Sequence, residues 1–310
     1  MSTDRIADST RMDAVTLHVR DLDATTSYYR DGIGLDVLDD APALGPEAAA
    51  AAADPRAATV ALGRGGRPLV VLRHEPDLPP APAGQAGLFH TALLFDDAAG
   101  LAGSVAGLAG LAPGTFVGSA DHLVSQAFYF TDPEGNGVEL YVDRPRDTWR
   151  WDGGRVAMDT RHLDPRAFLD EHLAPEHLAP EPRSPGRRPA TGSGAGVGHV
   201  HLQVGDVAVA REFYVGVLGF AETARVPGAL FVSAGGYHHH LAMNTWNSRG
   251  AGPRAASLGL GQVSITVPAP DDVAALADRL AHAGLTGRHD GASLRFDDPW
   301  GTLVEVRAAA

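Results

Sequence analysis

Apolar and polar residues alternate along short stretches of the chain, and this period of two predicts β-strands. Residues 14–19 and 198–204 alternate in this way and are rich in β-branched side chains. Amphipathic segments that start at an Asp follow such strands; at 271–283 the pattern predicts a helix whose first turn Asp271 can cap. Shorter strands separated by glycines come next, as at 127–130 and 138–142. The predicted order is therefore a strand, a helix and three further strands.

Two local patterns occur twice, in the same order in each half of the chain. In 19–35 and in 204–220 an Asp (Asp21, Asp206) is followed by an aromatic residue eight positions later and by a glycine thirteen positions later. The stretches 132–139 and 298–305 both begin with Asp-Pro and end on a Glu seven positions after the Asp. Two matches in the same order indicate an internal duplication.

The duplication divides the chain into four β-α-β-β-β modules, near residues 12–75, 86–143, 197–246 and 258–307. We expect two domains of two modules each, 12–143 and 197–307. Residues 144–196 form the expected linker, with a short helix at 164–172 and a stretch rich in Pro, Gly, Arg and Ser at 174–196.

Composition narrows the chemistry. The chain has 25 basic residues, all of them Arg, and 38 acidic residues, so its formal net charge is −13; without a basic run it is a poor partner for nucleic acid. The lack of Cys excludes disulfides, thiolate nucleophiles and Cys-ligated metals. No run approaches the roughly 18 apolar residues of a membrane span, and the N-terminal residues lack the apolar core of a signal peptide. We expect a cytoplasmic protein without a membrane partner, whose polar chemistry rests on its 14 His and its acidic residues.

The most specific local pattern covers residues 122–139. Two apolar strands flank the turn Pro-Glu-Gly-Asn-Gly, in which the glycines supply the positive φ that such turns need. Glu139 stands between Val138 and Leu140. A carboxylate among apolar neighbours is costly to bury unless it binds a cation or a donor. An edge strand with Glu139 facing water explains the pattern equally well.

This stretch resembles the signature of the extradiol ring-cleaving dioxygenases of the vicinal oxygen chelate superfamily, which also includes glyoxalases and bleomycin resistance proteins. His122, Tyr129, the Asp-Pro-x-Gly turn and Glu139 stand at the positions of that signature. Ala120 is a minor departure, since the signature prefers Gly, Asn, Thr or a β-branched residue there. With its four modules the whole chain resembles the two-domain bacterial catechol 2,3-dioxygenases. The resemblance implies an α+β fold in which four βαβββ modules form two half-open barrels.

The resemblance also implies a site. In that superfamily, metal ligands come from the first and last strands of paired modules. The first-strand positions here are Ala14, His90, His199 and Gln262, so only the second and third modules offer imidazole. The implied ligands of Fe(II) are His90, His199 and Glu139. The implied catalytic residues are His122 and Tyr129 from the signature and His239 from the run 238–240.

Strand alternation would place His238 and His240 on the face opposite His239. His201 follows His199 by two residues on the same face, where it can pack or support a ligand. In the fourth module Arg295 replaces the position of Tyr129.

Two arrangements of the modules remain open. The implied ligand set requires the second and third modules to form one barrel across the linker. If each half instead closes on itself, the second half offers His199, His239 and Glu305, and the first half only His90 and Glu139.

The resemblance implies cleavage of a catechol or substituted catechol by O2 with Fe(II), giving a product of the muconic-semialdehyde type. His239 would act as the base, Tyr129 would donate to a catechol oxygen, and His122 would stabilise the deprotonated substrate. One alternative is a glyoxalase-like isomerase or lyase that binds Zn, Ni or Mn through His90, Glu139, His199 and His239. Another is a metal-free protein that binds an aromatic compound or antibiotic. A homo-oligomer is permitted but not required.

Overall fold

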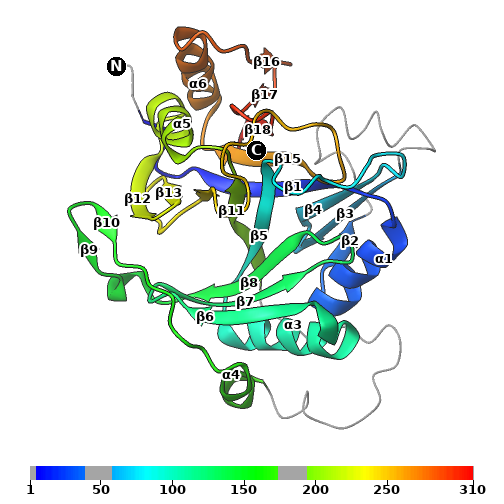
Figure 1. Cartoon of the computed structure of the whole chain (residues 1–310). Helices are drawn as coiled ribbons and strands as arrows, with labels where there is room; N and C mark the ends of the chain where they lie inside the picture. The colour runs from blue at the N-terminus through cyan, green and yellow to red at the C-terminus, as the bar shows by residue number, and fades with distance from the viewer. Residues whose placement is uncertain (1–4, 39–57, 174–193, 310) are drawn as a thin grey trace.

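The computed structural model describes residues 5–38, 58–173 and 194–309, and these residues form two eight-stranded mixed sheets (Figure 1). The first module contains β1 (Arg11–Val19), α1 (Leu22–Ser27), the π-helical turn η1 (Tyr28–Ile33), β2 (Asp36–Leu38), β3 (Thr59–Arg64) and β4 (Arg67–His74). The second contains β5 (Gly87–Phe95), α3 (Ala98–Leu111), the short 3-10 helix η3 (Pro113–Thr115), β6 (Phe116–Asp121), β7 (Ser125–Thr131) and β8 (Gly137–Asp143).

The second half repeats this order. The third module contains β11 (Ala195–Gln203), α5 (Val207–Arg211), η6 (Glu212–Val217), β12 (Ala221–Val226), β13 (Ala229–Ser233) and β14 (Leu241–Asn244). The fourth contains β15 (Gly259–Val267), α6 (Pro270–His282), β16 (Arg288–His289), β17 (Ser293–Asp297) and β18 (Leu303–Ala308). The α+β fold class and the four β-α-β-β-β modules are confirmed.

The duplicated Asp and Gly residues mark the start and the end of corresponding helical segments. Asp21 accepts a hydrogen bond from the backbone N–H of Ala24, and Asp206 accepts one from that of Ala208. Gly34 and Gly219 have φ of 88° and 86°, the left-handed conformation that ends a helix at low cost for glycine. The repeated spacing thus records the length of one capped helical segment.

The cap of α6 differs from the expectation. The helix begins at Pro270, and the carboxylate of Asp272, rather than that of Asp271, accepts from the N–H of Ala269 at 3.0 Å. Because proline suits the first helical position, its ring sets the start of the helix and moves the capping carboxylate to the third position.

Each of the two sheets contains strands from both halves of the chain. One has the order β16-β17-β18-β15-β1-β4-β3-β2, and the other has the order β12-β13-β14-β11-β5-β8-β7-β6. The first strands of the modules pair antiparallel, β1 with β15 and β5 with β11. The first module therefore joins the fourth, and the second joins the third. The domains expected at 12–143 and 197–307 do not coincide with these sheets, because each sheet takes one module from each half.

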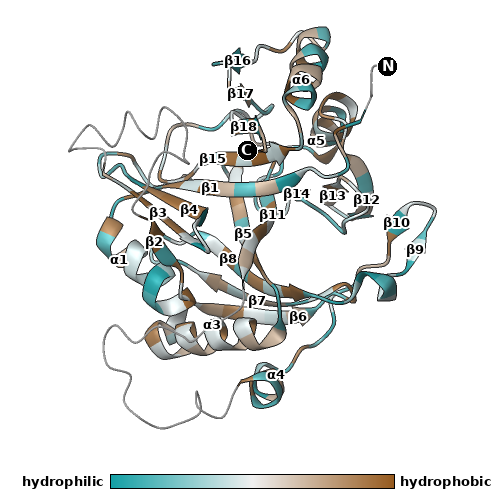
Figure 2. Ribbon diagram, turned by 180° about the vertical axis from the view of Figure 1, so that it is seen from behind, coloured by the Kyte–Doolittle hydropathy of each residue, from teal (hydrophilic) through white to brown (hydrophobic). Residues whose placement is uncertain are grey.

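One hydrophobic core runs through all four modules, with members from Ile6 to Val306. Figure 2 shows the hydrophobic colours concentrated on the strands of both sheets, whereas α4 (Pro165–His172) and the hairpin of β9 (Trp151–Asp152) and β10 (Arg155–Val156) are mostly hydrophilic. A shared core explains why the halves do not close separately: the apolar first strands complete their burial against each other.

The segment between the halves is described in part. The helix expected at 164–172 is confirmed as α4, and Asp164 caps it through the N–H groups of Arg166 and Ala167. Residues 174–193 of the expected linker lie outside the described residues. None of the helices in the described part of the chain is long and apolar enough to cross a membrane.

Candidate metal centre

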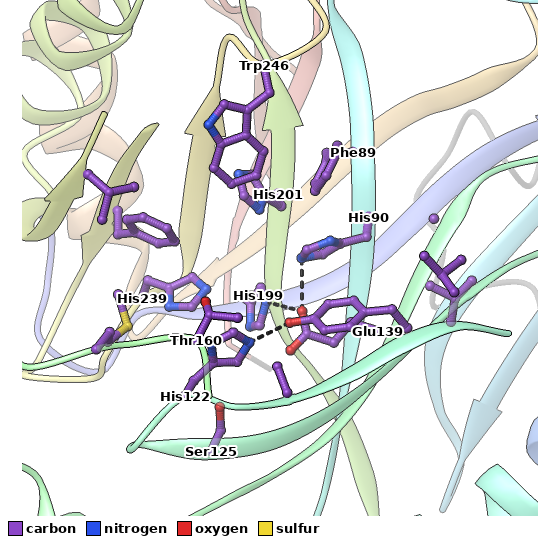
Figure 3. A pocket seen from close by; sticks show the side chains of 18 of the residues that line it. Phe89, His90, His122, Ser125, Glu139, Thr160, His199, His201, His239 and Trp246 are labelled. Carbon is purple, nitrogen blue, oxygen red and sulfur yellow. Dashed lines mark hydrogen bonds and ion pairs between the residues drawn. The ribbon is translucent and has the colours of Figure 1, made fainter. Parts of the chain in front are cut away.

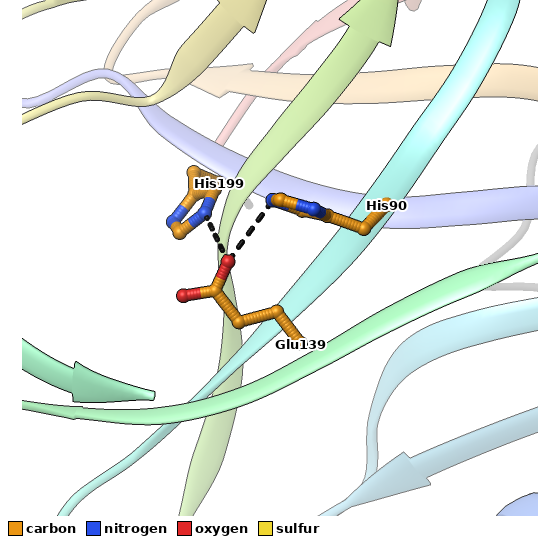
Figure 4. A group of neighbouring side chains, drawn as sticks. All are labelled: His90, Glu139 and His199. Carbon is orange, nitrogen blue, oxygen red and sulfur yellow. Dashed lines mark hydrogen bonds and ion pairs between the residues drawn. The ribbon is translucent and has the colours of Figure 1, made fainter. Parts of the chain in front are cut away.

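Three adjacent strands bring His90, Glu139 and His199 together. These residues lie on β5, β8 and β11, and one nitrogen or oxygen from each side chain lies within 4.8 Å of the others (Figure 4). Nε2 of His90 is 3.0 Å, and Nε2 of His199 is 3.2 Å, from the same carboxylate oxygen of Glu139. The structure thus pairs the second and third modules, as this set of residues requires.

The strand register explains how the three side chains meet. Glu139 on β8 is level with Ala92 on β5, and Ala92 is level with His199 on β11, so the three point to the same face. The small side chain of Ala92 leaves room between its larger neighbours, and His90 enters from two residues earlier on β5. The alternative in which Glu139 faces water is wrong: β8 lies inside the sheet between β5 and β7, and Glu139 is 2% exposed.

The electrostatics of the three residues favour a bound cation. Burial alone would raise the pKa of Glu139, but His199 and His90 outweigh burial and hold this pKa well below its usual value. Burial lowers the pKa of His199 to about 4, so its imidazole is neutral near pH 7. One carboxylate and neutral imidazole form a donor set that suits a divalent transition metal.

The residues also fit a metal geometrically. Nε2 of His90 is buried and makes no well-formed hydrogen bond, although the Glu139 oxygen lies 3.0 Å away. Nε2 of His199 does hydrogen-bond this oxygen, at 3.2 Å. An ion shared by the three side chains would give the buried His90 nitrogen the partner that it lacks.

The three residues line a cavity of about 610 Å³ (Figure 3). The rings of Phe89, Phe231 and Trp246 line one part of this cavity. His122, Tyr129 and His239 line it as well, so all six residues singled out from the sequence surround one space. A cavity of this size, with a mainly apolar lining that includes aromatic rings, accommodates a small aromatic molecule.

His122 and Tyr129 form a hydrogen-bonded pair. The Nδ1–H of His122 donates to the carbonyl oxygen of Asp159 at 2.8 Å, which leaves Nε2 free to accept from the hydroxyl of Tyr129 at 2.6 Å. Burial, together with Glu139, raises the pKa of Tyr129 well above its usual value. Its hydroxyl is therefore protonated near neutrality and able to donate.

His239 faces the cavity from a loop rather than from a strand. The run 238–240 precedes β14, after a turn in which Gly235 and Gly236 have positive φ. The ring centroid of His239 is 4.1 Å from that of His199. His238 and His240 are absent from the cavity lining, as expected. His239 is not part of the group of ligand atoms within 4.8 Å, so the described residues form a three-ligand cluster rather than a four-ligand one.

His201 lines the same cavity, next to the candidate metal ligand His90. It lies opposite His90 in the β5–β11 register, lines the cavity and receives a hydrogen bond from Nδ2 of Asn244 at 3.0 Å. Burial lowers its pKa well below the usual value. Its spacing of two residues from His199 predicted that it would face the same side of the strand.

Asp159 was not predicted from the sequence. It contributes to the site through its backbone carbonyl, which accepts from His122, and a backbone carbonyl leaves no signal in a sequence.

The sheet formed by the first and fourth modules has different side chains at the positions of the three candidate metal ligands. Glu305, at the position of Glu139, accepts from Nε of Arg295 at 2.8 Å and from the amide of Gln262 at 3.0 Å. In this sheet a guanidinium and an amide donate hydrogen bonds to the carboxylate of Glu305. In the sheet that contains β5, β8 and β11, two imidazoles approach the corresponding carboxylate of Glu139.

Comparisons with known proteins agree with this layout. Residues 11–140 and 196–306 match the model of the Glyoxalase/Bleomycin resistance protein/Dioxygenase superfamily. A catechol-2,3-dioxygenase of Bacillus subtilis (strain 168) is 33% identical over 299 residues, which cover 95% of each chain.

Two solved structures show the same fold. The crystal structure of a putative dioxygenase from Bacillus subtilis aligns with a TM-score of 0.63 and 13% identity, covering 98% of this chain and 86% of that one. Glyoxalase I from Zea mays aligns with a TM-score of 0.55 and 18% identity, covering 97% and 92%. The chain therefore belongs to the glyoxalase, bleomycin resistance protein and dioxygenase superfamily.

Proposed function

We propose that this protein is an Fe(II)-dependent extradiol dioxygenase that opens the ring of a catechol or substituted catechol with O2. The observation that carries the proposal is the convergence of His90, Glu139 and His199 at a cavity that His122, Tyr129 and His239 also line. The relative from Bacillus subtilis named catechol-2,3-dioxygenase supports the same reaction class.

The three clustered residues would hold the metal. Two neutral imidazoles and one carboxylate would leave a divalent ion with a net charge of +1, which favours a catechol bound as an anion. When bound, Fe(II) would supply coordination of both catechol oxygens and O2, and the redox chemistry of ring opening.

The cavity residues would handle the protons. His239, buried and with its pKa held well below the usual value by that burial, is neutral and can accept the proton of a catechol hydroxyl. In this structure the single hydroxyl hydrogen of Tyr129 goes to Nε2 of His122. With substrate bound, that hydrogen would go to a catechol oxygen instead, and Nε2 of His122 would be free to hydrogen-bond the substrate. Ring cleavage beside the diol would yield a product of the muconic-semialdehyde type.

The geometry favours this proposal over the two alternatives. A glyoxalase-like isomerase or lyase with Zn, Ni or Mn would use His239 as the fourth ligand, yet His239 lies outside the cluster of ligand atoms. A metal-free protein that binds an aromatic compound or antibiotic has no use for two imidazoles directed at one buried carboxylate.

The test is anaerobic reconstitution with Fe(II), followed by addition of catechol and O2. We expect a yellow ring-opened product, with about one O2 consumed per ring, because both oxygen atoms enter the product. Tight retention of Zn, Ni or Mn without oxygen uptake would favour the isomerase. Absence of both metal binding and uptake would leave the aromatic-binding protein.

Glu139→Gln provides a second test, because the amide removes the negative charge and one anionic ligand. We expect loss of bound iron and of turnover, measured by metal analysis and oxygen uptake. Glu305→Gln is the matched control, since it alters the corresponding position of the other sheet and should leave the iron bound. Retention of both iron and turnover by Glu139→Gln would contradict every metal-dependent function considered for this site.

A further inference from the structure

A chain of two hydrogen bonds runs from the end of β8 to His239. Nε2 of His238 lies 2.9 Å from a carboxylate oxygen of Asp143, and Nδ1 of His238 lies 2.7 Å from Nδ1 of His239. His239 lines the cavity (Figure 3), whereas His238 is not among the lining residues. Neither Asp143 nor His238 belongs to the six residues discussed above.

The surroundings of His238 keep this chain in place. Its side chain is fully buried, and its ring packs against those of Tyr237, Trp149 and Tyr141 at centroid distances of 4.1, 5.2 and 6.1 Å. Asp143 ends the strand that carries Glu139. The position of His238 is therefore coupled to the strand that holds the carboxylate of the metal cluster.

The two hydrogen bonds determine which nitrogen is protonated in His238 and in His239 when each ring carries one hydrogen. The carboxylate of Asp143 can only accept, so Nε2 of His238 carries a hydrogen. A His238 ring that carries one hydrogen then has its lone pair on Nδ1, and His239 supplies the hydrogen between the two Nδ1 atoms. The unprotonated nitrogen of His239 is then Nε2, for which no hydrogen-bond partner exists among the described residues.

We propose that Asp143 and His238 are positioning residues that hold His239 in the Nδ1–H tautomer, with the Nε2 lone pair directed into the cavity. This assignment rests on the hydrogen bonds. Its consequence for catalysis rests on the proposed function, in which that lone pair accepts a proton from the substrate. An Asp that fixes the tautomer of a catalytic imidazole is a known device in hydrolases, where its replacement by Asn reverses the tautomer and lowers kcat.

Nitrogen NMR tests the tautomer without reference to activity. In protein labelled with ¹⁵N-histidine and loaded with diamagnetic Zn(II), protonated and unprotonated ring nitrogens have well-separated shifts, and His239→Asn identifies the signals of His239. We expect a protonated Nδ1 and an unprotonated Nε2. In Asp143→Asn the amide can donate to Nε2 of His238, which transfers the His238 hydrogen to Nδ1 and reverses the tautomer of His239. A protonated Nε2 in the unaltered protein, or an unchanged tautomer in both Asp143→Asn and His238→Phe, would overturn the proposal.

Kinetics of the Fe(II)-loaded protein test the consequence. We expect Asp143→Asn and His238→Phe to lower kcat about 10- to 100-fold, the usual effect of losing a residue that orients an active-site group. KM for catechol and the iron content should stay within about twofold, because the cluster and the cavity wall are intact; a general structural defect would change them. Asp147→Asn, which removes the same charge from an exposed position of the same segment, should behave like the unaltered protein.

The two measurements separate the outcomes. If Asp143→Asn reverses the tautomer of His239 but leaves kcat unchanged, Asp143 and His238 do position His239, and His239 is not the base. If the unaltered protein does not cleave catechol, the proposed function fails while the NMR result still decides the tautomer.

Discussion

Burial lowers the pKa of histidines that line the cavity and of His240, which lies outside its lining. Burial lowers the pKa of His199, His201, His239 and His240, and for His199 and His240 the values are about 4 and 3. Neutral imidazole is the form that can bind a metal or accept a proton. The low exposure of these rings therefore prepares the chemistry proposed for the site, and it also makes the fold sensitive to acid.

His240 gives a measurable form of that sensitivity. Its Nδ1 accepts from the N–H of Ala234, and its pKa is about 3 in the folded state against about 6.5 in the unfolded chain. The unfolded state alone binds this proton between those values, so the contribution is complete above pH 6.5 and falls as the pH is lowered toward 3. Between pH 7.5 and 5 the free energy of unfolding should fall by about 2 kcal/mol for this group.

Urea unfolding of metal-free protein at pH 7.5 and at pH 5 measures this loss. His240→Asn keeps an acceptor near Nδ1 but cannot titrate, so its loss between the two pH values should be smaller by about that amount. An equal loss in both proteins would show that His240 does not carry the effect.

Tyr129 allows a test of the donor proposed for the substrate oxygen. Tyr129→Phe removes the hydroxyl while leaving the cluster of His90, Glu139 and His199 intact. A hydrogen bond to a charged oxygen is worth about 1.5–3 kcal/mol, so kcat should fall roughly 10- to 100-fold. Steady-state oxygen uptake and iron content give the measurement; an unchanged kcat with full iron occupancy would remove Tyr129 from the mechanism.

At the scale of the elements, the duplicated motifs meet each other. The hydroxyl of Tyr29 donates to Asp132 at 3.2 Å, and that of Tyr214 donates to Asp298 at 2.9 Å. The helical segment of the first module is thereby bonded to the Asp-Pro turn of the second module, and that of the third module to the Asp-Pro turn of the fourth. The residues that revealed the repeat are structural, and only Glu139 among them also belongs to the metal cluster.

Removal of either hydroxyl should destabilise the fold. Tyr29→Phe and Tyr214→Phe each take one donor from a buried carboxylate, at a cost of about 1–3 kcal/mol in the free energy of unfolding. Tyr28→Phe is the matched control, because the buried hydroxyl of Tyr28 makes no well-formed hydrogen bond in the described part of the chain and has only a weak interaction with Thr115. Denaturant titration of the three variants gives the comparison. Equal losses in all three would mean that the hydrogen bonds are not what stabilises these contacts.

The elements themselves were largely predictable, because each depends on neighbours in sequence. Alternation, Asp caps and left-handed glycines predicted the strand and helix order of all four modules, and Asp164 marked α4. Two local features were not. The position of the cap in α6 depends on Pro270, and the loop conformation of 238–240 depends on the turn before it.

At the scale of the molecule, the halves are interlocked. His90 and Glu139 come from the first half and His199 from the second, and both sheets contain strands of both halves. The cavity therefore exists only when the two halves are paired.

Cleavage of the chain between the halves tests this. A protease site introduced within residues 174–193 and cut after folding should leave the two fragments bound through β1 with β15 and β5 with β11. The fragments should elute together in native size-exclusion chromatography, keep the metal and separate only in denaturant. Separation under native conditions, with the metal retained by one fragment, would contradict the crossed pairing.

What the sequence determined by itself was local and patterned: the module order, the duplication, and the residue types at positions where a family resemblance implies ligands and catalytic groups. It left two pairings of the modules open, because a strand's alternation shows which side chains share a face but not which strand lies beside it. In the tertiary structure the first module pairs with the fourth and the second with the third, and the apolar first strands of the modules are buried against each other in one core. Only that pairing places His90, Glu139 and His199 within reach of one ion, and Asp143 and His238 in a hydrogen-bonded chain to His239.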